Sequence, residues 1–149
     1  IEERIEAVRR GVAGRHRPRV LVSVEREVGA GVVRELYAAG RGGIYDELVE
    51  LAGGENAYRR ESPAFPLISA EGIVNLDPDV VIDLVPDVEG RGIDTAAAAA
   101  DWDGIPGFGK KRRVCVVTAD YAFIPGPRFP RFLEDLAGMI HPRDSTETR

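Results

Sequence analysis

The sequence has little of what disulfide-linked, metal-binding and membrane-spanning proteins require. It holds one cysteine, Cys115, and two histidines, His16 and His141, among 149 residues. A single cysteine cannot form an internal disulfide, and two distant histidines fall short of the three or four converging ligands of a protein metal site. No apolar run approaches the roughly 20 residues of a transmembrane helix. We therefore expect no metal site in the protein itself.

Positive charge is also in short supply. The chain carries 20 Lys and Arg against 25 Asp and Glu, a net charge of −5. Because binding to nucleic acid depends on clustered cations, this balance argues against nucleic acid as a partner. Hydrophobic residues make up 44% and charged residues 30%, which is typical of a globular protein, and the length suits one domain.

Catalytic signatures are missing as well. There is no Gly-x-Ser-x-Gly motif, and Cys115 lies inside an apolar run, where a small buried side chain is the simpler interpretation. Residues 40–43 are rich in glycine and precede a helix, but they lack the spacing of either phosphate-binding motif. They can form a local anion site at a helix N-terminus or simply a flexible lead into the helix. We expect no catalytic residue; a small enzyme domain that binds a nucleotide or sugar phosphate at residues 40–43 is the alternative.

Apolar β-branched runs alternate with amphipathic segments along the chain. Strands are predicted over residues 19–24, 80–85 and 114–118, with a minor strand at 56–58. Helices are predicted over residues 1–14, 44–52, 67–76, 93–102 and 129–140. Residues 25–43 hold five glycines and are predicted as a loop with a helical turn at 32–38. Because each clear strand is apolar on both faces, we expect an α/β fold with a mostly parallel sheet between two helical layers.

One candidate binding segment, residues 120–129, follows the third predicted strand. Ligands of open parallel sheets bind beyond the carboxyl ends of the strands. Aromatic side chains there can stack on a large ligand, and Arg128 can pair with a carboxylate or phosphate. Equally, Phe123 and Phe129 can belong to the core and Arg128 to a solvated helix start. Phe65, on a loop stiffened by prolines, is a similar aromatic candidate.

A second candidate is the helix start at Ser69, which can cap the first turn and places Glu71 within it. The Glu71 carboxylate can complement the helix dipole, or it can face solvent and meet an arginine of a partner. Composition alone favours the dipole.

Three segments match one family in order and spacing. Residues 43–57 resemble a helix followed by Ala-Gly-Gly-x-Asn, and residues 69–82 resemble a Ser-x-Glu … Leu-x-Pro-Asp-hydrophobic element. Residues 102–128 resemble the closing region of the same proteins. That family is the class III substrate-binding proteins of ABC importers, which carry cobalamin and ferric siderophores. The resemblance implies a Rossmann-like lobe with three layers.

The resemblance also divides the chain. It implies that residues 1–17 end the helix between two lobes and that residues 18–142 form the C-terminal lobe, followed by a polar tail at 143–149. The N-terminal lobe would supply the other wall of the cleft, so this chain alone is expected to bind ligand weakly.

The family's functional residues carry over to particular positions. Glu71 matches the glutamate that docks onto arginines of the membrane permease subunits. Phe65 falls where a ligand-facing aromatic is common, and Arg128 where a ligand-contacting arginine is common, with Tyr121 on the same loop. Arg26 lies on the first ligand-side loop, without a matching motif residue.

The function implied is solute binding, not catalysis. The chain would bind a ferric siderophore, haem or cobalamin as transported ligand, with no resident cofactor, and deliver it to the permease. Its place would be periplasmic or extracytoplasmic, with a lipoprotein anchor left open.

Overall fold

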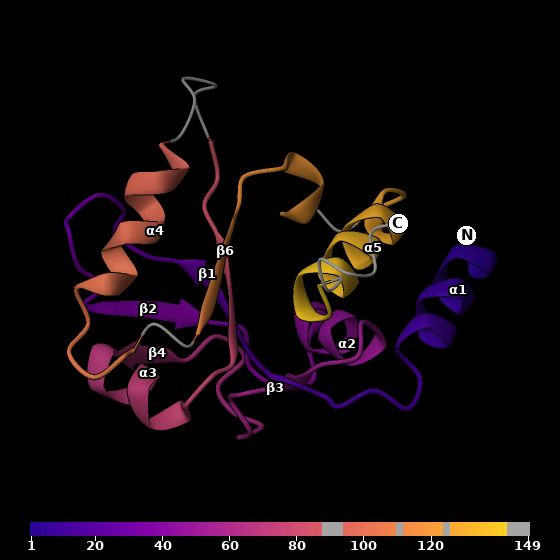
Figure 1. The fold of residues 1–149 in the computed structure, drawn as a ribbon, viewed down its shortest axis with the longest axis horizontal. Coiled ribbons are helices and arrows are strands. Elements are labelled where there is room, and N and C mark those ends of the chain that lie inside the picture. Colours follow the sequence, from indigo (N-terminus) through magenta and orange to yellow (C-terminus); the bar gives the residue numbers. More distant parts are fainter. Residues whose placement is uncertain (88–93, 110–111, 124–125, 143–149) are drawn as a thin grey trace.

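Six strands form one mixed sheet with helices on both faces (Figure 1). The computed structural model describes residues 1–87, 94–109, 112–123 and 126–142. The strands are β1 (Arg19–Glu25), β2 (Glu35–Ala38), β3 (Glu55–Asn56), β4 (Leu67–Ser69), β5 (Val80–Leu84) and β6 (Arg113–Val117). The helices are α1 (Glu2–Val12), α2 (Ile44–Leu51), α3 (Ala70–Leu76), α4 (Thr95–Asp103) and α5 (Phe129–Ile140), with a short 3-10 helix η1 (Asp120–Ala122).

The sheet order is β4-β2-β1-β5-β6, with β3 also pairing to β1. Strands β1, β3, β5 and β6 run parallel, whereas β2 pairs antiparallel with both β1 and β4. The carboxyl ends of β1, β5 and β6 therefore lie at one edge of the sheet.

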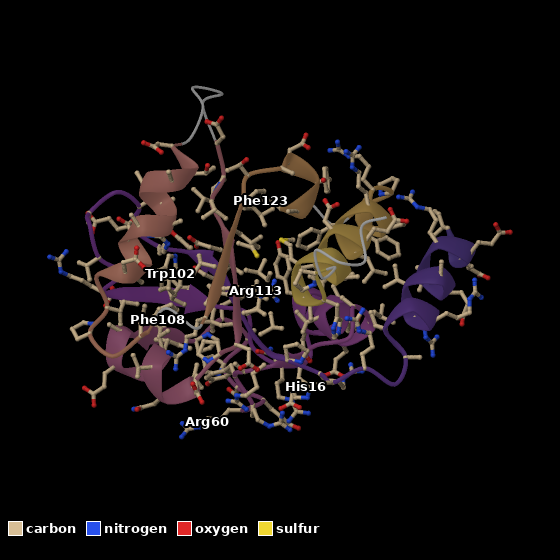
Figure 2. The ribbon with its side chains drawn as sticks, viewed as in Figure 1. His16, Arg60, Trp102, Phe108, Arg113 and Phe123 are labelled. Carbon is tan, nitrogen blue, oxygen red and sulfur yellow. The ribbon has the colours of Figure 1, made fainter. Side chains whose placement is uncertain are left out.

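Alternation along the strands produces two cores. Val20 and Val22 of β1 face the layer of α1, α2 and α5, whereas Leu21 faces α3 and α4. The second core contains the buried Trp102, which Figure 2 shows beside Phe108 near α4. This arrangement confirms the predicted three-layer α/β fold, because strands buried on both faces need helices on both sides.

Two sequence predictions were wrong. The helical turn expected at 32–38 is replaced by β2, in which Leu36 and Ala38 are buried and Glu35 and Tyr37 are exposed. This two-residue period suits a strand with one buried face. The helix expected from residue 67 begins instead at Ala70, because Leu67–Ser69 form β4 opposite β2. The tail at 143–149 and residue 93 lie outside the described residues.

Helix α1 rests on the surface of the domain. Ile5 and Val8 pack on the first core, and Arg4 contacts Glu134 of α5 at 2.6 Å. In the part of the chain that the structure describes, no helix combines the length and the apolar character needed to cross a membrane.

Candidate functional site

An exposed apolar face lies where β2 pairs with β4. Tyr37, Phe65 and Leu67 have exposed fractions of 43%, 54% and 53%, and exposed apolar side chains that lie near one another can mark a binding surface. Tyr37 and Leu67 are register partners, so their side chains lie on the same face of the sheet. Phe65 lies two residues before Leu67, and the ladder continues there through the Gly40 amide, which donates to the Ala64 carbonyl at 2.7 Å. We call these three residues, the aromatic Tyr37 and Phe65 and the aliphatic Leu67, the aromatic face.

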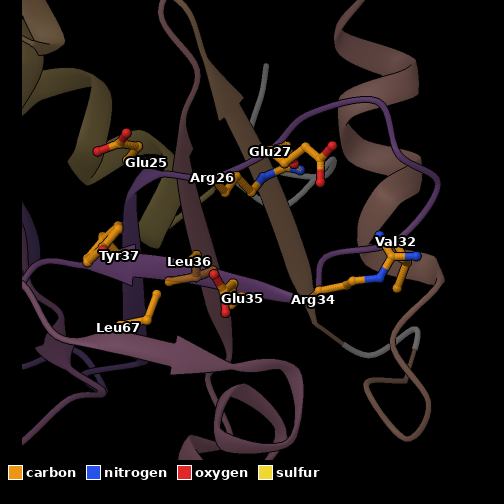
Figure 3. A pocket seen from close by; sticks show the side chains of 9 residues that line it. All are labelled: Glu25, Arg26, Glu27, Val32, Arg34, Glu35, Leu36, Tyr37 and Leu67. Atoms are coloured by element: carbon orange, nitrogen blue, oxygen red, sulfur yellow. Dashed lines mark hydrogen bonds between the residues drawn. The ribbon is translucent and has the colours of Figure 1, made fainter.

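A pocket of about 300 Å³ opens beside this face, between the loop after β1 and strands β2 and β4 (Figure 3). Tyr37 and Leu67 line one end, and Val32 and Arg34 line the other. The full lining is Glu25, Arg26, Glu27, Val32, Arg34, Glu35, Leu36, Tyr37 and Leu67. A cavity with one apolar end and one charged end suits a ligand of mixed character.

The guanidinium of Arg26 is turned inward from this pocket. Its side chain is 1% exposed and pairs with Asp83 at 2.7 Å and Asp101 at 2.9 Å. Burial alone would lower the pKa of Arg26, but hydrogen bonds to the two carboxylates raise it. The positive charge of Arg26, which we expected to meet a ligand, is instead paired with the carboxylates of Asp83 and Asp101.

Asp101 is held as an anion by the same cluster. Burial alone would raise the pKa of Asp101, but hydrogen bonds from Arg26 and from the amides of Gly29 and Gly31 lower it. Trp102 donates its indole N–H to the other carboxylate, Asp83, at 3.0 Å.

Tyr121 and Arg128 come together at the start of α5. The Arg128 guanidinium lies 5.8 Å from the centre of the Tyr121 ring, and that of Arg131 lies 5.1 Å away. The Tyr121 hydroxyl donates to Asp135. This hydrogen bond is the main cause of the raised pKa of Tyr121, and burial of the hydroxyl adds to it. Arg128 also pairs with Asp120 at 3.2 Å. The two residues predicted for one loop are thus in contact.

The start of α2 connects this cluster to the aromatic face. Gly40, just before α2, bonds to Ala64 next to Phe65. Tyr45, in the first turn of α2, donates its hydroxyl to the Ala122 carbonyl of η1 at 2.8 Å. Among the described residues, no hydrogen bond or ring contact joins Phe65 to Tyr121 or Arg128; the two groups are connected through α2.

The structure bears on both interpretations of Phe123, Phe129 and Arg128, as core or solvated residues and as ligand contacts. Phe123 and Phe129 are partly buried against the first core, as expected of core residues. Arg128 is 59% exposed at the start of its helix, as expected of a solvated residue, yet it also lies over Tyr121.

The glycine-rich segment before α2, residues 40–43, is already bonded to a carboxylate of the protein, that of Asp46. Asp46 accepts the Gly42 amide at 2.9 Å and also the Asn56 side-chain amide at 3.1 Å. An external phosphate at this helix start would have to displace a carboxylate that is already bonded, so the geometry disfavours the nucleotide alternative. Nowhere in the described ranges do three or more His, Cys, Asp or Glu side chains gather to hold a metal ion.

Comparisons with solved structures show what this arrangement resembles. The apo form of the periplasmic heme-binding protein RhuT from Roseiflexus sp. RS-1 is 28% identical, with a TM-score of 0.67 over 93% of this chain and 52% of its own. An ABC-type Fe3+-hydroxamate transport protein from Saccharomonospora viridis DSM 43017 is 22% identical, with a TM-score of 0.73 over 94% and 46%. The periplasmic vitamin B12 binding protein BtuF of Vibrio cholerae is 17% identical, with a TM-score of 0.64 over 93% and 50%.

The chain has the fold of one lobe of an ABC-importer substrate-binding protein. It spans about half the length of the structures that it matches. A scan of protein-family models found no match, and a search of curated proteins found none either.

In this lobe, Glu71 lies exposed in the first turn of α3. The predicted cap is present, since Ser69 accepts the Gly72 amide at 3.1 Å. Strand β4 runs directly into this helix, so Glu71 lies only four residues after Leu67 of the aromatic face.

Sequence reasoning missed several residues of the lobe. Tyr37 and Leu67 were overlooked because β2 and β4 were not predicted as strands. The alternation of Glu35-Leu36-Tyr37-Ala38 was the available signal for β2. Asp83 and Asp101 were overlooked because they are 57 and 75 residues from Arg26 in the chain, and no local pattern joins them.

Proposed function

We propose that this chain is the C-terminal lobe of the solute-binding component of an ABC importer and that it captures a metal chelate, haem being the first candidate. Residues 18–142 would form the lobe, and residues 1–17 would end the helix that leads to the other lobe. The observation that carries the proposal is the exposed aromatic face, which accompanies the fold of a substrate-binding lobe.

The aromatic face explains why a chelate would bind here. A large planar or ring-shaped ligand can cover Tyr37, Phe65 and Leu67 at once and remove their apolar surface from water. A small hydrophilic solute would leave most of that surface exposed.

Arg128 explains why an anionic chelate is favoured. Its partner Asp120 is 75% exposed, and pairs between solvated side chains are weak. The Arg128 guanidinium can therefore exchange this carboxylate for one on a ligand while remaining stacked on Tyr121. Haem combines a planar ring with two carboxylates, and heme-binding proteins are among the structural neighbours, one of them RhuT at 28% identity. Ferric siderophores and cobalamin are the competing ligands.

Glu71 would deliver the loaded protein to the permease. It is exposed, it is held in a capped first turn, and a carboxylate there can pair with an arginine of the membrane subunits. Because single surface pairs contribute little affinity, Glu71 would fix the orientation of docking more than its strength.

The direct test is ligand binding by the whole protein that carries this lobe. We expect haem to raise the melting temperature and to bind with a saturable change in its absorbance, whereas ATP and AMP do neither. A ferric hydroxamate and cyanocobalamin serve as the rival chelates. Stabilisation by a nucleotide, with no response to any of the three chelates, would overturn the proposal.

A further inference from the structure

We propose that Arg26, Asp83 and Asp101 form a buried clamp that fixes the loop 26–34 as one wall of the ligand pocket. Arg26 is then a positioning residue and not a ligand contact. This inference rests on the proposed function, because it assigns the pocket wall a role in holding the chelate.

The first step is the burial of three charges together. The side chains of Arg26, Asp83 and Asp101 are 1%, 0% and at most 2% exposed. Arg26 contacts Asp83 through both Nε and Nη2 and contacts Asp101 through Nη1. The guanidinium carbon Cζ of Arg26 lies 5.4 Å from the centre of the Trp102 ring. A planar guanidinium is suited to such simultaneous contacts, because its five N–H groups point in fixed directions.

The second step is that the clamp holds backbone as well as side chains. Asp101, in α4, accepts the Gly29 amide at 2.7 Å and the Gly31 amide at 2.9 Å. Arg26 donates to the Glu27 carbonyl within the loop and to the Ala98 carbonyl of α4, each at 2.9 Å. Three hydrogen bonds from Arg26 to Asp83 therefore join the loop to β5, and four more, to Asp101 and the Ala98 carbonyl, join it to α4.

Glycine is required at positions 29 and 31, whose amides donate to Asp101. Gly29 and Gly31 have φ values of +89° and +85°, which other residues adopt only with strain. At the far end of α4, a Cβ on Gly104 would lie 2.4 Å from the Gly31 carbonyl oxygen. The loop is thus pressed against the end of α4 as well as bonded to Asp101.

Stability alone does not account for this cluster. Burying three charges costs hydration, and apolar side chains of similar volume often give equal or greater stability. One net negative charge also remains, which the two glycine amides and the Trp102 N–H help to offset. What apolar residues cannot supply is a fixed path for the loop, and that path forms the pocket wall at Glu27, Val32 and Arg34.

Asp101→Asn in the full-length protein tests the clamp. The amide side chain keeps the size of Asp101 but removes the charge that holds Arg26 and two loop amides. We expect amide exchange at residues 27–31 to accelerate at least about tenfold and the bound haem to dissociate about tenfold faster.

Ser23→Ala is the matched control. Ser23 is the β1 register partner of Asp83, is fully buried, and its hydroxyl has no hydrogen-bond partner in the described structure. Its removal takes away a buried polar atom on the same face without breaking the clamp, so loop exchange and haem release should match the wild type.

Arg26→Lys covers the case in which Asp101→Asn fails to fold. Lysine keeps a buried cation but cannot reach both carboxylates and both carbonyls, so we expect intermediate loop exchange and intermediate release. Unchanged loop exchange in the folded variants would overturn the clamp, and so would faster exchange with unchanged release. If the wild type binds none of the chelates, the proposed function fails, whereas the exchange result still decides whether the clamp exists.

Discussion

At the scale of single residues, Phe65 is the side chain whose exposure most needs an explanation. A Phe65→Ala variant should weaken chelate binding by about tenfold, because the removed ring would otherwise cover apolar ligand surface. Equilibrium titration of the full-length protein measures the effect. Ile1→Ala removes a side chain that is 66% exposed just before α1 and should leave the affinity unchanged. Equal affinities for all three proteins would show that Phe65 does not touch the ligand.

Asp101 gives a pH dependence whose sign follows from its lowered pKa. A carboxyl whose pKa is lower in the folded than in the unfolded state stabilises the fold above its ordinary pKa of about 3.9. That contribution is lost as the pH falls through the lower, folded value. The difference in unfolding free energy between wild type and Asp101→Asn should therefore be constant near neutral pH and shrink below about pH 4. Urea unfolding from pH 7 to pH 2.5 measures it, and a difference that grows in acid would contradict the assignment.

Arg26 shows where residue-level sequence reasoning stops. Its position directly after the first strand is confirmed, whereas its place on the ligand side stays a prediction. Whether an arginine there faces a ligand or an internal carboxylate depends on Asp83 and Asp101, which only the folded chain brings near. Glu71 and Ser69 were easier, because a helix cap is encoded within four residues.

At the scale of elements, the pairing of β2 with the segment before β4 depends on one glycine. A Cβ on Gly40 would lie 2.6 Å from the Pro63 carbonyl oxygen and 2.8 Å from that of Ala64. Gly40→Ala should therefore push this segment away, lower the unfolding free energy by about 1–3 kcal/mol and weaken chelate binding through Phe65. Chemical denaturation and titration measure the two effects.

The comparison for Gly40→Ala is Gly138→Ala. Gly138 lies in α5 with open space around its missing Cβ, so alanine there should stabilise the helix by about 0.5–1 kcal/mol. Two Gly→Ala changes with opposite signs would separate the close backbone approach from the general effect of replacing glycine. Stabilisation by both would contradict the packing at Gly40.

The strands buried on both faces were predictable, and the edge of the sheet was not. Strands β1, β5 and β6 appear in the sequence as apolar runs, because both of their faces meet helices. Strands β2 and β4 have four and three residues, and they form because each supplies hydrogen-bond partners to the other. Such short strands give only a brief alternation, as in Glu35-Leu36-Tyr37-Ala38, which favours a strand too weakly to decide against a turn or a helix start.

At the scale of the whole molecule, capture and delivery should be separable. Glu71→Ala is expected to leave chelate affinity unchanged in the full-length protein while uptake by cells falls, because Glu71 faces outward from the lobe. Uptake of labelled chelate measures delivery. The control is Glu47→Ala, which removes an exposed glutamate from a different helix, α2. Normal uptake with Glu71→Ala would remove it from the docking surface.

The single tryptophan of the chain stands inside the clamp, with its ring N–H on Asp83 and its face toward Arg26. Its fluorescence is therefore sensitive to the same bonds that order the loop. Emission from this one fluorophore would report loosening of the pocket wall in the lobe without any added label.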